Sequence, residues 1–134
     1  MTSGTSPKSN NKPKGRFAEL HAAAYLCRNG CKILARNYRY RNGELDIVAK
    51  DANGIILFVE VKSVWNADRG NPASRVGGKK QLRIWRTAVH FLHFNGGLDQ
   101  KSRFDVIGID LRRGKMELRH YPDAFTASRV IPEC

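Results

Sequence analysis

The sequence predicts an α/β domain in which a β-sheet is flanked by helices, in the order helix, three strands, helix, two strands. Three observations predict this fold class. A helix-prone, Ala-rich segment occupies residues 15–28, short apolar segments separated by turn residues follow it, and an amphipathic segment at residues 79–94 interrupts the strands. With 134 residues, the chain is long enough for one hydrophobic core and too short for two of ordinary size.

The first fourteen residues differ in composition from the rest. The segment MTSGTSPKSNNKPK is rich in Ser, Asn, Pro and Lys and lacks the apolar stretch of a secretory signal. We therefore expect a disordered basic arm over residues 1–14 and a single domain over residues 15–134. Because no run of about 18 apolar residues occurs, we expect no membrane-spanning segment.

The first helix, residues 15–28, is apolar on most sides. One face combines four residues: Phe17, Leu20, Ala24 and Cys27. Glu19 lies on another face that is otherwise apolar. We expect the helix to pack deeply, with Cys27 a buried and inert thiol and Glu19 buried as well. Asn29 and Gly30 then form a helix stop of the left-handed type.

Three strands are predicted to follow. The first covers residues 31–40, an Asn-Gly turn leads to the second at residues 44–50, and the compact loop at residues 51–54 leads to the third. The third strand, IILFVEVK at residues 55–62, is apolar almost throughout. This pattern indicates a central strand that is covered on both faces of the sheet.

A long loop at residues 63–78 leads to the second helix, residues 79–94. The residues predicted to face inward are Leu82, Trp85, Val89 and Leu92, and an outward basic stripe comprises Lys79, Arg83, Arg86 and His90. Loops of this length in compact domains are more often functional than idle. Two further strands are predicted at residues 103–110 and 115–121, joined by a turn that contains Gly114.

The chain is strongly basic. It has 24 Lys and Arg against 12 Asp and Glu, a net charge of +12, to which the arm contributes only Lys8, Lys12 and Lys14. The excess favours a polyanionic partner, nucleic acid first and an anionic membrane surface second; the alternative is that the charge only maintains solubility. The three cysteines form no C-x-x-C pair and have no His at zinc spacing, which favours a cytoplasmic protein with reduced thiols.

Two predicted strands carry carboxylates among apolar side chains, within GELDIVAKDANGIILFVEVKS at residues 43–63. Alternate side chains of a strand share one side, so Glu60 and Lys62 face the same way, and the hairpin could bring Asp46 alongside Glu60. Two carboxylates in an apolar setting repel unless a cation compensates them. Lys62 could neutralise one in a structural salt bridge. A Mg²⁺ or Mn²⁺ ion held by Asp46, Glu60, a backbone carbonyl and waters would neutralise both.

Five motifs occur in order: G-R-x-A-E (15–19), N-x-R-x-x-x-G-E-L-D (37–46), V-E-V-K (59–62), K-Q-x-x-I (80–84) and R-F-D-V (103–106). Together they resemble the YraN-type family of small bacterial proteins. This family belongs to the PD-(D/E)XK nuclease superfamily and is similar to archaeal Holliday junction resolvases. The resemblance implies a restriction-endonuclease-like core, with a mixed central sheet flanked by helices.

The resemblance also implies residue roles. Asp46 and Glu60 would be ligands of Mg²⁺ or Mn²⁺, Lys62 the active-site lysine, and Glu19 the helix carboxylate that completes the catalytic cluster. Lys80 and Gln81 match positions near the scissile phosphate in similar nucleases, with a pair of solvated residues at a helix start as the alternative. Arg103 and Asp105 match a motif whose role cannot be derived from the sequence; we expect a structural ion pair at the sheet edge.

The leading hypothesis is a metal-dependent endonuclease that acts on DNA, with Lys79, Arg83 and Arg86 gripping the backbone. A branched or flapped substrate rests on the resemblance alone, as does a possible homodimer. The first alternative is a non-catalytic nucleic-acid-binding module on a nuclease fold. The second, a membrane-surface or protein adaptor, would require an exposed apolar patch beside the basic stripe, and the sequence indicates none.

Aromatic and basic residues also alternate in the segment Tyr38, Arg39, Tyr40 and Arg41. Proteins that bind single strands mix these groups, but the alternation of an ordinary strand explains the pattern equally well. We expect Trp85 to belong to the core. We expect His90 and His93 to be a solvated pair, because no third metal ligand is apparent nearby.

Overall fold

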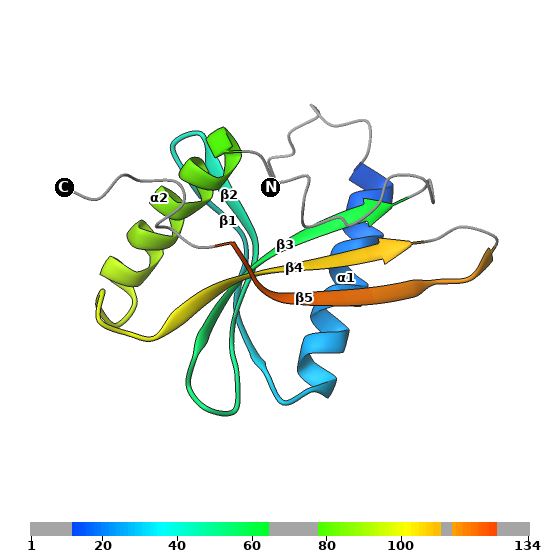
Figure 1. Ribbon diagram of the computed structural model, residues 1–134, viewed down its shortest axis with the longest axis horizontal. Coiled ribbons are helices and arrows are strands. Elements are labelled where there is room, and N and C mark those ends of the chain that lie inside the picture. The colour runs from blue at the N-terminus through cyan, green and yellow to red at the C-terminus, as the bar shows by residue number, and fades with distance from the viewer. Residues whose placement is uncertain (1–11, 65–77, 111–113, 126–134) are drawn as a thin grey trace, which may run out of the picture.

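The computed structural model describes residues 12–64, 78–110 and 114–125. Its elements are α1 (Lys12–Arg28), β1 (Lys32–Tyr40), β2 (Gly43–Lys50), β3 (Ile56–Val64), α2 (Gly78–Phe94), β4 (Ser102–Asp110) and β5 (Glu117–Phe125). Their order confirms the predicted α/β fold class (Figure 1). Most of the predicted loop at residues 63–78 lies outside the described residues, and β3 extends two residues into it. Neither described helix is both long and apolar enough to cross a membrane.

Helix α1 begins earlier than predicted. It starts at Lys12 rather than Gly15, so residues 12–14 of the predicted arm belong to the helix. Residues 1–11 lie outside the described residues, and their disorder stays a prediction. The single domain over residues 15–134 also stays a prediction.

The five strands form one mixed sheet in the order β1-β2-β3-β4-β5. Strands β1, β2 and β3 are joined as antiparallel neighbours, and β4 pairs antiparallel with β5. Strand β3 pairs parallel with β4 along its whole length. A parallel pair cannot be joined by a tight turn, and α2 lies on the connection between these two strands.

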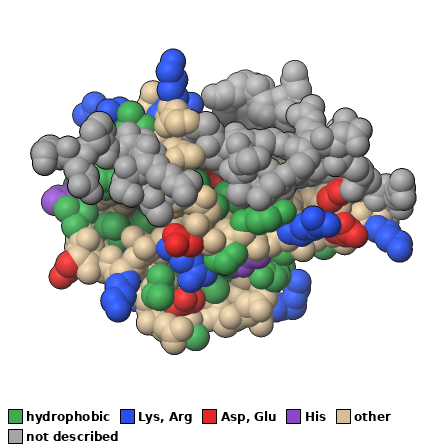
Figure 2. Space-filling model, in the orientation of Figure 1, with side chains coloured by type: hydrophobic (Ala, Val, Ile, Leu, Met, Phe, Trp, Pro, Cys, Tyr) green, Lys and Arg blue, Asp and Glu red, His purple; other side chains and the backbone are tan. Residues whose placement is uncertain are grey.

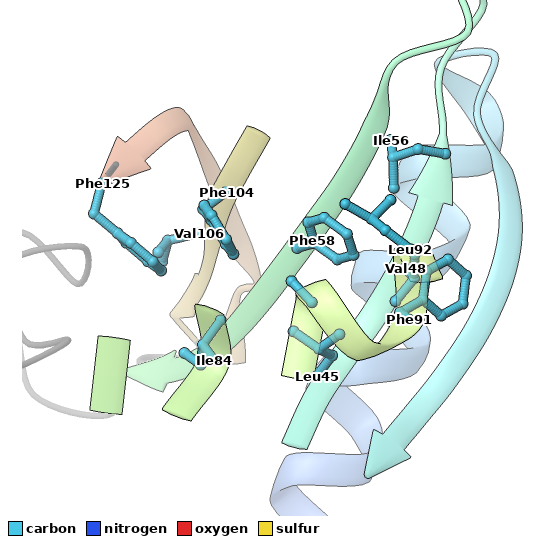
Figure 3. Close-up of a cluster of buried hydrophobic side chains, with 11 residues drawn as sticks. Leu45, Val48, Ile56, Phe58, Ile84, Phe91, Leu92, Phe104, Val106 and Phe125 are labelled. Atoms are coloured by element: carbon cyan, nitrogen blue, oxygen red, sulfur yellow. The ribbon is translucent and has the colours of Figure 1, made fainter. Parts of the chain in front are cut away.

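The sheet is buried on both faces. The α1 side of the core includes Ala18, Ala22, Leu26, Ile47, Leu57, Val59, Ile107 and Ile109. The α2 side includes Leu45, Val48, Phe58, Ile84, Phe91, Phe104 and Phe125 (Figure 3). Strand β3 contributes to both clusters, which confirms the prediction of a central strand. Figure 1 shows α1 and α2 on opposite sides of the sheet, giving a helix–sheet–helix arrangement.

Helix α1 buries a narrower face than predicted. Ala18 and Ala22 are at most 1% exposed against the sheet, whereas Phe17 and Leu20 remain 42% and 50% exposed. Cys27 is also exposed, so the prediction of a buried thiol was wrong. The small alanine side chains let the helix backbone approach the sheet closely, and the larger side chains of the neighbouring face project away from it.

Helix α2 is rotated relative to the prediction. Its buried residues are Ile84, Thr87, Ala88, Phe91 and Leu92, and of the predicted inward set only Leu92 is among them. Leu82, Trp85 and Val89 are half-buried. His90 was predicted to face outward, yet its ring stacks on that of Tyr40. The rotation reflects close contact of the small side of the helix with the start of β2.

That contact depends on Gly43, the first residue of β2. A β-carbon at this position would collide with the Thr87 hydroxyl and would lie 2.7 Å from the carbonyl oxygen of Arg83. Both groups are fixed, because the Thr87 hydroxyl donates a hydrogen bond of 2.8 Å to that same carbonyl. The hairpin and the helix can therefore meet only where the strand carries no side chain.

We expect Gly43→Ala to lower the free energy of unfolding by about 1–3 kcal/mol, the usual cost of overpacking a close contact. Urea denaturation at neutral pH would measure the change. Gly78→Ala is the matched control, since Gly78 has nothing within 4 Å of an added β-carbon. Alanine favours helices, so this control should be neutral or slightly stabilising. Equal midpoints for Gly43→Ala and the parent would contradict the close contact.

Candidate active site

Strands β2 and β3 separate at the position of the predicted carboxylates. Their pairing ends at Ile47 opposite Val59, and continuing the register would place Asp46 opposite Glu60. Instead, the backbone N–H of Val61 donates a hydrogen bond of 2.8 Å to Oδ2 of Asp46. The Asp46 side chain thus provides a hydrogen-bond acceptor for β3 at the fork, the point where β2 and β3 separate. This explains how a carboxylate can be held firmly in an otherwise apolar region.

Glu60 is the most buried acid of this cluster, with 7% of its surface exposed. The ammonium nitrogen of Lys80 lies 2.6 Å from its Oε2, and that of Lys62 lies 3.7 Å from the same oxygen. The prediction that Glu60 and Lys62 face the same side of β3 is confirmed, and the salt bridge considered as the alternative to a metal site is present between them. The contact with Lys80 was missed, because this residue was placed near the substrate phosphate rather than on the carboxylate.

The charges of this cluster shift one another's pKa values. Burial raises the pKa of Asp46 well above its usual value, and the nearby charge of Glu60 adds to the rise. Burial and the neighbouring Lys80 ammonium lower the pKa of Lys62. Burial acts to lower the pKa of Lys80, but the Glu60 carboxylate outweighs this effect, so the pKa of Lys80 is raised. The two lysines therefore differ: Lys80 holds its proton tightly, and Lys62 releases one more easily.

Glu19 lies at the margin of this cluster. Its Oε1 accepts a hydrogen bond of 3.1 Å from the Asn37 amide and lies 4.0 Å from the Arg36 guanidinium. Asn37 has a positive φ of 53° in β1, which is a conformation that Asn tolerates. The charge of Glu19 contributes to the raised pKa of Asp46. Its predicted catalytic role stays a prediction.

A cavity of about 250 Å³ opens between the hairpin and the start of α2. Its lining residues are Asn42, Gly43, Glu44, Asp46, Glu60, Lys80, Arg83 and Ile84. Both predicted metal ligands and one lysine therefore reach the same space. The Asn-Gly turn was recognised in the sequence only as a turn, and its place on the cavity wall depends on the packing of α2 against Gly43.

The donor set of this cavity fits a hard divalent cation. Among the described residues, no group of three or more His, Cys, Asp or Glu side chains is placed to hold a metal ion. Asp46 and Glu60 would therefore be two protein carboxylates completed by a backbone carbonyl and waters. Mg²⁺ commonly binds in this way, through one or two carboxylates plus waters and substrate phosphates.

The predicted nucleic-acid-binding residues lie along the first turns of α2. Lys80 and Arg83 line the cavity, Arg86 is exposed one turn further on, and Lys79 is exposed at the helix start. Gln81 is half-buried. On the face shown in Figure 2, Lys and Arg side chains are spread over the surface and alternate with acidic ones. Basic side chains therefore do not form one continuous patch on that face.

Arg103 and Asp105 form an ion pair, as predicted, but not at the sheet edge. They lie on β4, which has β3 and β5 on its two sides. Asp105 is fully buried and accepts hydrogen bonds from Arg103, from His120 Nε2 at 2.7 Å and from the backbone N–H of Asp123 at 2.9 Å. The Tyr25 hydroxyl lies 3.0 Å from His120 Nδ1. This network ties β4, β5 and α1 together on the face opposite the cavity.

Comparison with known proteins gave one family. The model described as uncharacterised protein family UPF0102 matches residues 18–109. The UPF0102 protein of Chlorobium phaeobacteroides is 45% identical over 120 residues, covering 84% of this chain and 93% of that protein. The UPF0102 protein of Anaeromyxobacter dehalogenans is 40% identical over 111 residues, covering 83% and 82%.

Among solved structures, SfsA of Pyrococcus furiosus in complex with Ca²⁺ matches with a TM-score of 0.38 and 16% sequence identity. The match covers 84% of this chain and 63% of SfsA. A likeness this slight carries no argument about function.

Proposed function

This chain belongs to the UPF0102 family, within the restriction-endonuclease-like superfamily, and on that premise we propose that it is a metal-dependent endonuclease acting on DNA. The observation that carries the proposal is the meeting of Asp46, Glu60, Lys62 and Lys80 where β2 and β3 separate. Bringing the Asp46 and Glu60 carboxylates together in one small cavity costs free energy through repulsion and desolvation. A bound catalytic cation would compensate the charge of both carboxylates and would explain why they lie together.

Asp46 and Glu60 would hold Mg²⁺ or Mn²⁺ in this cavity. Such an ion supplies Lewis-acid activation of water and of the phosphodiester. Lys62 has a lowered pKa and lies beside Glu60, so it is suited to orient the attacking water or to stabilise charge that develops on the phosphate. Lys80 stays protonated, and a substrate phosphate would compete with Glu60 for its ammonium group.

The start of α2 supports DNA as the substrate. Arg83 lines the cavity, Lys79 and Arg86 lie on the same helix and could contact further phosphates, and the net charge of +12 favours a polyanion. Gln81 lies on the same helix and is proposed to assist near the scissile phosphate. A branched DNA substrate and a homodimeric assembly rest on the resemblance to junction resolvases.

The test is a cleavage assay with the full chain on end-labelled single-stranded, duplex, flapped and four-way-junction DNA. We expect cleavage in Mg²⁺ or Mn²⁺, strongest on a branched substrate, and none in EDTA. Cleavage in EDTA would overturn the metal requirement. Absence of cleavage of every substrate in both metals would overturn the proposed activity.

One observation favours the non-catalytic alternative. Glu60 already has two ammonium partners, at 2.6 and 3.7 Å, so its charge is compensated without a metal. In that case the protein would bind nucleic acid on a nuclease fold, with Lys62 and Lys80 as structural partners. Titration with Mn²⁺ separates the two functions, since only a metal site of the catalytic kind should bind the ion at millimolar concentration.

A further inference from the structure

A second and larger depression adjoins the candidate active site. It has a volume of about 750 Å³ and lies between the end of β1 and the outer side of α2. Asn42 and Arg83 line both this groove and the smaller cavity, so the two spaces are adjacent. A substrate that places a phosphate at Asp46 and Glu60 could therefore extend into the groove.

Aromatic rings form one wall of the groove. The rings of Tyr40 and His90 are stacked, with centroids 4.0 Å apart and an interplanar angle of 17°. The Phe94 ring lies 4.9 Å from that of His90, and 66% of Phe94 is exposed. The Phe94 ring is tilted by 49° from that of His90, so the three rings form an angled wall on which Phe94 presents the most open face.

Tyr38, which packs against the core, fixes the orientation of this wall. Its hydroxyl lies 2.6 Å from His90 Nδ1, and its ring packs edge-on against Phe91 in the core. Tyr38 therefore fixes the imidazole of His90, while Tyr40 stacks on the same ring at the groove. Tyr38 thus contributes to packing against the core, and Tyr40 contributes to the wall of the groove.

The groove is also suited to an anion. Three guanidinium groups line it, those of Arg41, Arg83 and Arg86, and Arg41 lies 5.3 Å from the centre of the Tyr40 ring. His90 and His93 line it too, and none of the described residues that line it is acidic. Aromatic faces combined with guanidinium groups are the chemistry by which proteins bind unpaired nucleotides, through base stacking and phosphate contacts.

We propose that this groove binds an unpaired stretch of the DNA substrate next to the cleaved phosphodiester, an inference that rests on the proposed nuclease function. Bases would stack on the wall formed by Tyr40, His90 and Phe94, and phosphates would contact Arg83 and Arg86. Bases inside a duplex have their faces covered by their neighbours, so such a wall is useful only for unpaired bases. The inference narrows the substrate class to DNA with a single-stranded flap, fork or end.

The experiment is a binding titration in EDTA, by fluorescence anisotropy, of a labelled flapped duplex and a blunt duplex of the same sequence. The variants are Tyr40→Ala and Phe94→Ala. Each should weaken binding of the flapped DNA by about tenfold, the usual loss when a stacking aromatic is removed, and should leave the blunt duplex within about twofold of the parent. Phe94 is so exposed that its variant should fold even if Tyr40→Ala does not.

Phe17→Ala is the matched control, because Phe17 is also an exposed ring packed on a histidine, 4.2 Å from His21, but lies on α1. It should bind both DNAs as the parent does. Unchanged flap binding by both groove variants, or equal losses on flapped and blunt DNA, would overturn the proposal and leave a protein partner as the occupant of the groove. Because EDTA prevents metal-dependent cleavage, flap-specific losses would support the groove even if the catalytic function failed.

Discussion

Asp46→Asn is expected to remove metal-dependent cleavage while leaving the protein folded and at least as stable as the parent. Loss of one of two carboxylate ligands removes several kcal/mol of transition-state stabilisation, which corresponds to a fall in kcat of about 10² to 10³. The amide oxygen of Asn can still accept the hydrogen bond from the Val61 N–H, so the fork between β2 and β3 should keep its shape. Initial rates under single-turnover conditions in Mn²⁺ would measure the loss.

The stability expectation follows from the raised pKa of Asp46. Burial and Glu60 raise this pKa above its unfolded value, so the favourable contribution of the group is present below the unfolded pKa and is lost as pH rises through the folded pKa. Above its unfolded pKa the buried carboxyl group therefore works against folding, and the neutral amide of Asn removes that cost. Urea denaturation should give Asp46→Asn a midpoint at or above that of the parent.

The control for this variant is Glu117→Gln, which removes a carboxylate exposed on β5. It should cleave DNA at the parental rate. Full activity in Asp46→Asn would show that the carboxylate is not a ligand. Loss of activity together with a lowered unfolding midpoint would assign Asp46 to structure instead. Only loss of cleavage with retained or increased stability agrees with a site that has been kept for catalysis.

The central part of this site could be predicted from the sequence because it depends on local geometry. The strand period places Glu60 and Lys62 on one side of β3, and the compact hairpin brings Asp46 to the neighbouring position. The hydrogen bond from the Val61 N–H could not be predicted, since it arises only where pairing stops. Periodicity indicates which residues share a face but not where two strands separate.

The contribution of α2 depends on packing between distant segments. The 2.6 Å contact between Lys80 and Glu60 is set by where α2 begins and by its close approach at Gly43. Hydrophobicity alone favoured a face that includes Trp85, but small residues such as Thr87 and Ala88 are buried instead. Helix α1 shows the same effect, because alanines rather than Phe17 face the sheet. In α2 the buried residues Ile84, Ala88, Phe91 and Leu92 also recur at helical spacing, so the hydrophobic pattern allowed two faces, and the close approach at Gly43 distinguishes them.

The sequence indicated that Arg103 and Asp105 form an ion pair but not how deeply the aspartate is buried. Its other partners, His120 and Asp123, come from β5 and are distant in the sequence. Asp123 has a positive φ of 53°, and its N–H turns toward the carboxylate where the pairing between β4 and β5 is irregular. The Asp105 carboxylate therefore accepts a hydrogen bond from a backbone N–H of β5 where regular strand pairing is interrupted. The Asp46 carboxylate does the same for the Val61 N–H of β3 on the other side of the sheet.

Asp105→Asn is expected to be strongly destabilising. It leaves the Arg103 guanidinium without its buried counter-charge and His120 without a carboxylate partner, and breaking such a pair costs about 3 kcal/mol or more. Burial alone would raise the pKa of Asp105, but the hydrogen bonds from His120 and Arg103 outweigh it and lower the pKa below the usual value. The contribution of the group is therefore present above its unfolded pKa and is lost as pH falls through its lowered folded pKa.

Urea denaturation of parent and variant across this pH range would test the assignment. The difference in free energy of unfolding should be largest at neutral pH and should shrink below about pH 4, where the unfolded carboxyl takes up its proton. Glu117→Gln should show no such dependence. A difference that stays constant with pH would mean that Asp105 acts through shape and hydrogen bonding alone. Because the network lies opposite the cavity, the variant should retain metal-dependent cleavage at temperatures where it is folded, which separates the structural carboxylate from the catalytic ones.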